Sequence, residues 1–130
     1  MKTLLIGSMK KIEHFFKWMN AANEVFEVML IVSEDMLETT KFQCPVQSLS
    51  YMSEVKNEYD IVFICSDFYQ KLGHVLMRIG FTKEQIEPEN GICKYLSKSD
   101  IMTYYAETIY ETYEYEKTED IAEVGAFTYG

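Results

Sequence analysis

The chain has 130 residues, 48% of them hydrophobic, which is the size of one domain with a core of its own. Its formal net charge of −9 is concentrated near the end, because residues 107–130 hold seven acidic residues against Lys117 alone. With this charge and no basic stripe, nucleic acid and anionic membrane surfaces are excluded as expected partners.

Cysteine usage and short apolar runs indicate the compartment. The three cysteines (Cys44, Cys65 and Cys93) have no C-x-x-C spacing and no nearby histidine pair, so the sequence predicts neither a disulfide framework nor a zinc site. The longest apolar run, VMLIV, is too short to cross a bilayer, and MKTLLIG is too short for the core of a signal peptide. We therefore expect a cytoplasmic protein without membrane insertion.

The first half of the chain alternates apolar runs with residues at helical spacing. The stretch TLLI ends at Gly7, and VFEVMLIVS is mostly apolar and β-branched, as a strand buried on both faces requires. Apolar residues recur at helical spacing between these two runs. The patterns predict, in order, a strand at 3–6, a helix over 12–22, a strand at 25–33, a brief strand at 44–46 and a helical turn over 49–55.

The second half contains the clearest strand. Five apolar residues at 61–65 predict a buried strand, and Ser66 or Asp67 is expected to cap the helix that follows. Gly80 and Phe81 predict that this helix has a Schellman ending. One more strand or extended segment is expected within 86–96, before a final helix that opens with Ser97 and Asp100 in a capping-box-like pattern.

This alternation predicts an α/β fold, specifically a small Rossmann-like three-layer sandwich with a mainly parallel sheet and helices on both faces. Leu5, Ile31, Val62 and Ile64 are expected to be buried in the centre of the sheet. The expected organisation is a Rossmann-like domain at 1–96, a C-terminal helix at 97–116 that packs on it or extends from it, and a linker with one short repeat at 117–130.

In open α/β sheets, ligands bind beyond the carboxyl ends of the strands. The first such segment holds Gly7, Ser8 and Lys10, which predict a phosphate site at a helix N-terminus. The dinucleotide fingerprint G-x-G-x-x-G is absent, because Met9 and Ile12 stand where it requires glycine. Tight approach to a pyrophosphate is therefore not indicated.

Two further segments complete the predicted substrate-binding set. Ser33, Glu34 and Asp35 follow the second strand, where an acid can bind a ribose hydroxyl or serve only as a solvated turn residue. The third segment is Ser66, Asp67 and Phe68, for which helix capping is the alternative explanation.

No catalytic residue and no metal ligand is predicted. His14 and His74 are expected on the solvent sides of their helices, with no serine, cysteine or carboxylate constellation around them. Cys65 is most simply a core residue. Several tyrosines go round the final helix, so some must face solvent or a partner, which makes a homo-oligomer one expected state.

Three stretches carry a resemblance to known proteins. The phrases YDIVFICS and IGFTKEQI resemble the N-terminal Rossmann-like domains of bacterial proteins that modify sugars and build surface polysaccharides. The closing EVGAFTYG looks like the opening of the hexapeptide-repeat, left-handed β-helix domain of sugar O- and N-acetyltransferases, with Val124, Gly125 and Thr128 at the three defined positions. A truncation at the start of that repeat domain is the corresponding expectation.

The resemblance implies a non-catalytic domain that holds a nucleotide-linked or related sugar substrate at the strand ends. Acetyl-CoA and the catalytic histidine would then belong to a missing C-terminal domain, and this chain would need no cofactor. Two alternatives stay open: an assembly or interaction module with a degenerate Rossmann site, and an accessory domain of a sugar methyltransferase-type protein in polysaccharide biosynthesis.

Overall fold

The computed structural model describes residues 1–35 and 38–109. The expectation about a repeat at 124–130 therefore lies outside the described residues, as does the expected end of the C-terminal helix at 116. The chain divides into two compact units, one of Met1–Leu96 and one that begins at Ser97. The first unit holds the whole sheet.

The first unit is built on one six-stranded sheet in the order β3-β4-β2-β1-β5-β6. All neighbouring strands are parallel except the short pair β3 and β4. The chain thus starts in the middle of the sheet, builds outward to β2 and β4, and then crosses to β5 and β6, as in the doubly wound Rossmann order. The strands are β1 Lys2–Gly7, β2 Glu27–Ser33, β3 Thr40–Lys41, β4 Cys44–Ser48, β5 Ile61–Cys65 and β6 Ile86–Pro88.

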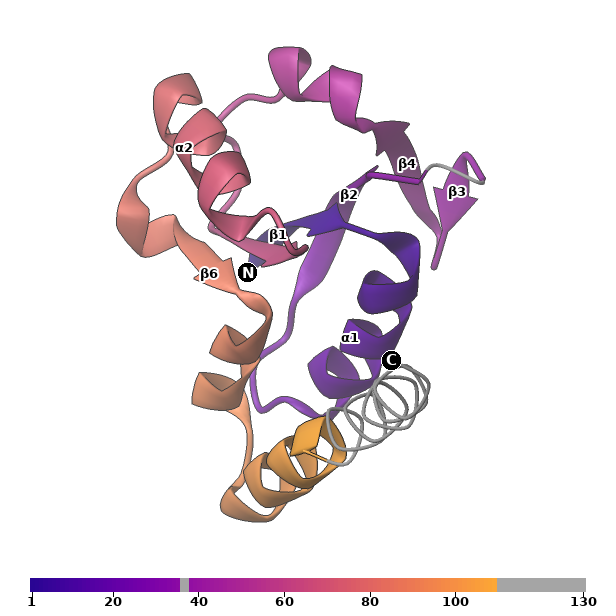
Figure 1. The fold of residues 1–130 in the computed structure, drawn as a ribbon, viewed down its shortest axis with the longest axis vertical. Helices are drawn as coiled ribbons and strands as arrows, with labels where there is room; N and C mark the ends of the chain where they lie inside the picture. The colour runs from indigo at the N-terminus through magenta and orange to yellow at the C-terminus, as the bar shows by residue number, and fades with distance from the viewer. Residues whose placement is uncertain (36–37, 110–130) are drawn as a thin grey trace, which may run out of the picture. The chain divides into compact units, whose positions relative to one another are not determined.

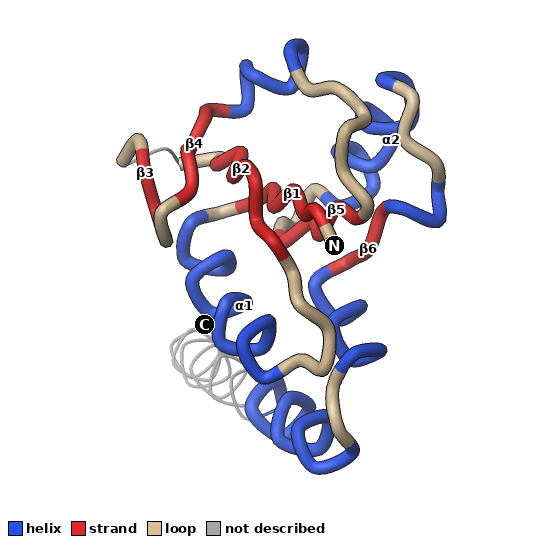
Figure 2. The backbone as a smooth tube through the Cα atoms, turned by 180° about the vertical axis from the view of Figure 1, so that it is seen from behind, coloured by secondary structure: helices blue, strands red, loops and turns tan. Residues whose placement is uncertain are grey.

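Helices cover both faces of the sheet (Figure 1, Figure 2). Helix α1 (Met9–Ala21) and the 3₁₀ segment η3 (Glu89–Tyr95) pack on one face, while α2 (Tyr69–Ile79) and the 3₁₀ segment η1 (Leu49–Glu54) lie on the other. A further 3₁₀ turn, η2 (Lys83–Gln85), joins α2 to β6. The predicted mainly parallel α/β sandwich is confirmed.

The core lies on both faces of the sheet, around β1 and its two neighbours β2 and β5. Leu5, Ile31, Val62 and Ile64 are all at most 1% exposed, which confirms their predicted burial. Because side chains alternate across a strand, Val62 and Ile64 pack beneath α2, whereas Phe63 faces α1, where its ring lies 4.9 Å from that of Phe15.

The sequence signals at the end of α2 and at the start of the helix over 98–109 act as predicted, whereas the expected cap of α2 by Ser66 or Asp67 is wrong, because its N-cap is Phe68. Gly80 is left-handed (φ 118°), and the backbone N–H of Phe81 donates to the carbonyl of Leu76 (3.0 Å), which gives α2 its Schellman-type ending. The Ser97 hydroxyl oxygen accepts from the N–H of Asp100 (3.2 Å) and caps the helix over 98–109 in the second unit.

Several boundaries differ from those expected. Strand β2 begins at Glu27 rather than at 25, and the side chain of Val25 is 79% exposed. The segment 86–96 is a three-residue strand followed by the 3₁₀ helix η3, because Pro88 cannot donate to a further ladder bond. The β3–β4 hairpin was not predicted from the sequence, because its two-residue turn contains neither glycine nor asparagine.

That hairpin turn is strained in a testable way. Phe42 and Gln43 both have positive φ (52° and 63°), a conformation that costs an ordinary residue about 1 kcal/mol. Phe42 gains a compensating contact, since its ring stacks on Phe16 with centroids 3.8 Å apart. We expect Gln43→Gly to raise the free energy of unfolding by about 0.5–1 kcal/mol in denaturant titrations, with Gln43→Ala giving no gain. Equal stabilities for both variants would contradict the strain at this turn.

Candidate functional site at the strand ends

The candidate site lies where the order of the parallel strands reverses. After β1 the chain turns into α1 on one face, and after β5 it turns into α2 on the other face. The carboxyl ends of these adjacent strands therefore face the same region, which in open α/β sheets is the usual ligand position. Gly7 is the last residue of β1 and Ser8 follows it, while Ser66, Asp67 and Phe68 follow β5 directly.

Gly7 is needed by the fold itself. A Cβ at this position would lie 1.9 Å from the carbonyl oxygen of Cys65 on the neighbouring strand. The close approach is continued by the N–H of Ser8, which donates to the same oxygen (3.2 Å). The strand spacing thus explains the glycine without a phosphate ligand.

The N-terminus of α1 already holds an anion, the carboxylate of Asp35. Its Oδ1 accepts from the N–H of Met9 (2.8 Å), the first residue of the helix, and also from the buried hydroxyl of Ser33 (3.1 Å). The Ser8 hydroxyl oxygen accepts from the N–H of Lys11 (3.4 Å). The position that a phosphate takes in nucleotide-binding Rossmann domains is therefore filled from within the chain.

These contacts set the charge of Asp35. The hydrogen bond from Met9 N–H lowers the pKa of this carboxyl, and the bonds from Ser33 and from its own backbone N–H act in the same direction, against a smaller opposing effect of burial. A lowered pKa means that the contact stabilises the fold above the ordinary aspartate pKa and is lost as the pH falls through the lowered value. The carboxylate is therefore present at neutral pH.

Lys11 is the cation of the site. Its Nζ lies 2.6 Å from Oδ1 of Asp67, so the ion pair joins α1 to the end of β5. The hydrogen bond to Asp67 raises the pKa of Lys11, opposed by burial and supported by the charges of Asp67, Glu89 and Glu34. An incoming phosphate would therefore meet an ammonium group surrounded by carboxylates.

A hollow of about 410 Å³ opens beside this ion pair. We call it the β5–α2 hollow, and it is lined by Asp67, Phe68, Tyr69, Gln70 and Lys71. The Phe68 ring is 56% exposed, and the Lys71 ammonium lies 5.9 Å from its centroid. The side chain of Asp67 is 83% exposed, which leaves its second oxygen open to a ligand.

The remaining predicted residues have smaller roles in this geometry. The Ser66 hydroxyl oxygen accepts from the N–H of Phe68 (3.0 Å), but neither Ser66 nor Asp67 caps α2, whose N-cap is Phe68 without a side-chain bond. Lys10 is exposed, and its side chain pairs with none of the described residues. Glu34 donates its N–H to the carbonyl of Gly7 (2.9 Å), while its Oε1 is buried without a hydrogen-bond partner in the structure.

The sequence interpretation thus found the three strand ends but missed Lys11. The helical spacing of the sequence does indicate Lys11. This residue lies four positions before the buried Phe15 and therefore on the sheet-facing side of α1, whereas Lys10 does not lie on that side. Burial raises the pKa of the Cys65 thiol well above its usual value, as expected of a core cysteine.

Across residues 1–35 and 38–109, no group of histidine, cysteine and acidic side chains has a geometry that could hold a metal ion. Over the same residues, no helix has the length and apolar character needed to span a membrane. The sequence matches no protein-family model and no curated protein.

Proposed function

We propose that residues 1–96 form a non-catalytic sugar-holding domain of a sugar acetyltransferase, with the sugar bound in the β5–α2 hollow. The hexapeptide-like stretch EVGAFTYG and the Rossmann-type strand order support the class of protein. In such a protein, acetyl-CoA and the reaction would belong to a β-helix domain outside this chain.

The observation that carries the choice of ligand is the carboxylate of Asp35 at the N-terminus of α1. A nucleoside diphosphate-sugar would need that position for its diphosphate, and Glu34, Asp67 and Glu89 act on the nearby ammonium group of Lys11. Like charges in this arrangement repel a phosphate. The site therefore favours an uncharged sugar, or the sugar part of a larger acceptor, over a nucleotide.

The β5–α2 hollow offers the groups that an uncharged sugar needs. The carboxylate of Asp67 accepts hydrogen bonds from hydroxyl groups, and the amide of Gln70 both donates and accepts. The exposed ring of Phe68 offers a flat apolar surface for the C–H face of a pyranose. The pair with Lys11 fixes the Asp67 carboxylate in position before a ligand arrives.

Binding of free sugars to the chain tests this proposal. We expect 2-acetamido hexoses and unmodified hexoses, titrated at high millimolar concentration, to shift the backbone amide resonances of residues 67–71. Phe68→Ala should weaken binding by about tenfold, because an aromatic contact of this kind contributes on the order of 1 kcal/mol beyond buried area. Phe42→Ala is the matched control, since that exposed ring lies outside the hollow. Equal affinities for the two variants would contradict the proposed site.

A second candidate function is assembly, and one observation favours it. The helix over 98–109 carries Met102, Tyr105 and Ile109 at intervals of three and four residues, with exposed fractions of 72%, 45% and 68%. Apolar side chains at this spacing form one stripe, as in helices that pair with a second helix. Sedimentation of the chain over a range of concentrations tests this candidate function. A monomer at all concentrations would contradict self-assembly through this helix.

A further inference from the structure

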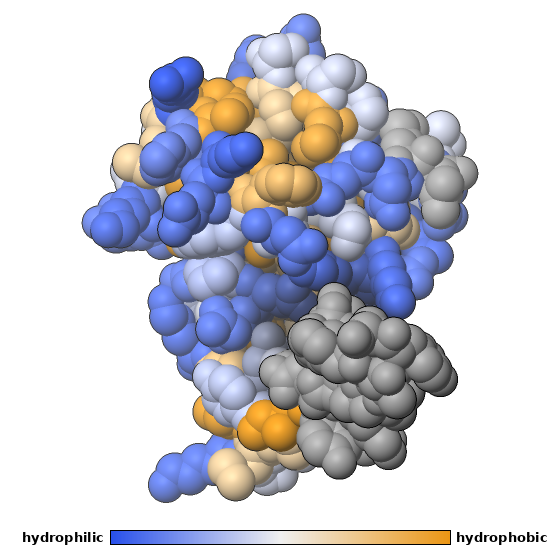
Figure 3. Space-filling view, viewed as in Figure 1, coloured by the Kyte–Doolittle hydropathy of each residue, from blue (hydrophilic) through white to orange (hydrophobic). Residues whose placement is uncertain are grey.

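A second hollow runs along α2 from Tyr69 and Gln70, which also line the β5–α2 hollow, toward β6. It has a volume of about 270 Å³ and is lined by Tyr69, Gln70, Gly73, His74, Met77, Lys83 and Ile86. We call it the α2–β6 hollow. The space-filling view shows apolar surface over α2 beside hydrophilic residues (Figure 3).

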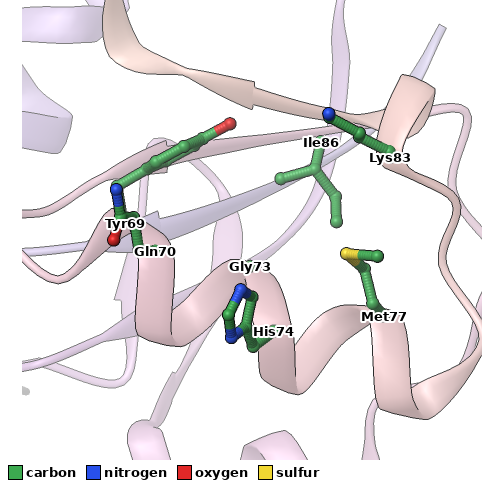
Figure 4. Close-up of a pocket in the computed structure, with 7 residues that line it drawn as sticks. All are labelled: Tyr69, Gln70, Gly73, His74, Met77, Lys83 and Ile86. Atoms are coloured by element: carbon green, nitrogen blue, oxygen red, sulfur yellow. The ribbon is translucent and has the colours of Figure 1, made fainter.

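The lining separates into an apolar floor and a polar rim. Ile86 and Met77 point toward one another across the hollow, with the Lys83 ammonium and the Tyr69 hydroxyl at its rim (Figure 4). The rim groups from Tyr69, Gln70, His74 and Lys83 all include a hydrogen-bond donor, and none is a carboxylate. Such a set recognises an anion attached to an apolar body.

The residues that line this hollow are free of acids, although the protein as a whole has a net charge of −9. In a chain with 21 acidic residues, the stretch from Phe68 to Lys83 contains none, and the first acid after it, Glu84, does not line the hollow. Lys83 makes no ion pair with the residues that the structure describes, whereas the neighbouring Glu87 is paired with Lys94. The ammonium group of Lys83 is therefore available to an external anion.

The turn that carries Lys83 is held in place before any ligand binds. Gln85 accepts from the N–H of Thr82 (2.9 Å) and donates to the side chain of Asn57 (2.9 Å) and to the carbonyl of Tyr59 (2.9 Å). These bonds tie η2 to the loop before β5. The backbone of the turn that carries Lys83 is therefore ordered before a ligand binds at this rim.

Gly73 supplies an independent observation. It lies inside α2, where glycine destabilises a helix relative to alanine, yet a Cβ there would meet only the side chain of Ile86 at 4.0 Å, an ordinary contact distance. The fold therefore does not require glycine at this position. What the glycine does provide is open space at the floor of the hollow.

We infer that the α2–β6 hollow binds a small carboxylate with a single-ring apolar body. The ring occupies the space above Gly73 between Met77 and Ile86, and the carboxylate accepts hydrogen bonds from Lys83 and Tyr69. The size of the hollow, slightly below the usual range for ligand pockets, limits the ligand to about one ring.

Titration with benzoate, followed by backbone amide resonances, tests this inference, with benzamide as the uncharged probe of the same shape. We expect benzoate to shift resonances within residues 73–86, which do not line the β5–α2 hollow, and to bind at least tenfold more tightly than benzamide. Lys83→Met should lower benzoate affinity at least tenfold, since it removes a charge-assisted hydrogen bond but keeps the apolar stem. Lys56→Met is the matched control and should leave the affinity unchanged.

Gly73→Ala separates binding from folding. We expect this variant to unfold at a higher temperature than the original chain and yet to bind benzoate several-fold more weakly, because its methyl group narrows the floor. Equal affinity for benzoate and benzamide, unchanged affinity in Lys83→Met or Gly73→Ala, or no benzoate-induced shift within 73–86 would each overturn the inference.

Discussion

Gly7→Ala is expected to destabilise the fold by about 3 kcal/mol or more, one of the largest effects that a single methyl group could have in this chain. The added Cβ would lie 1.9 Å from the carbonyl oxygen of Cys65, which belongs to the backbone of the adjacent central strand and cannot rotate away. The pairing of β1 with β5 would have to open, and with it the core on both faces. Denaturant unfolding of the variant measures the loss.

Gly73→Ala is the matched control for this prediction. It adds the same methyl group in a place without a close contact, and we expect it to stabilise the chain by about 0.5–1 kcal/mol through helix propensity alone. A Gly7→Ala variant as stable as the original chain would show that the strand spacing does not require glycine. The prediction that Gly7 serves a phosphate site would then again be the better explanation of this glycine.

Asp35→Ala is expected to create a phosphate site where the original chain has none. Removing this carboxylate frees the N–H of Met9 and exposes the positive end of the α1 dipole next to Lys11. We expect the variant to bind inorganic phosphate and UMP at least tenfold more tightly than the original chain, with an affinity that falls as salt is added. Calorimetric titration at neutral pH provides the comparison.

Glu54→Ala controls for the change in net charge. Glu54 is an exposed acid at the end of η1, so its removal changes the net charge by the same amount but leaves the N-terminus of α1 filled. If Glu54→Ala gained as much phosphate affinity as Asp35→Ala, the gain would come from the change in net charge and not from the N-terminus of α1. If neither variant gained any, the carboxylate of Asp35 would not be what keeps phosphate out.

The strands and helices were predictable where local signals agreed with the tertiary structure. The run Ile61–Cys65 was long and apolar enough to specify a central strand, and Gly80 with Phe81 marked the end of α2. The β3–β4 hairpin was not predictable, because Phe42 and Gln43 adopt left-handed backbone conformations that their side chains disfavour. Packing of Phe42 on Phe16, a contact between distant residues, helps to hold that turn.

The candidate site was predictable in position but not in chemistry. The rule that ligands lie beyond the carboxyl ends of parallel strands located Ser33, Asp35 and Asp67 from sequence alone. It could not show that Asp35 folds back onto α1, since that bond joins residues 26 positions apart. For the same reason the sequence does not show the partner of Asp67, although the helical spacing of α1 already places Lys11, and not Lys10, on the sheet-facing side.

One measurement tests the central claim most directly, namely that the strand-end site holds a sugar and not a nucleotide. Amide resonances of the same labelled sample would be followed in parallel titrations with a free 2-acetamido hexose and with UMP. We expect the sugar to shift the resonances of residues 67–71, whereas UMP should leave those of residues 7–12 unchanged because Asp35 occupies the N-terminus of α1. UMP-induced shifts at residues 7–12, or no response of residues 67–71 to any hexose, would contradict the central claim.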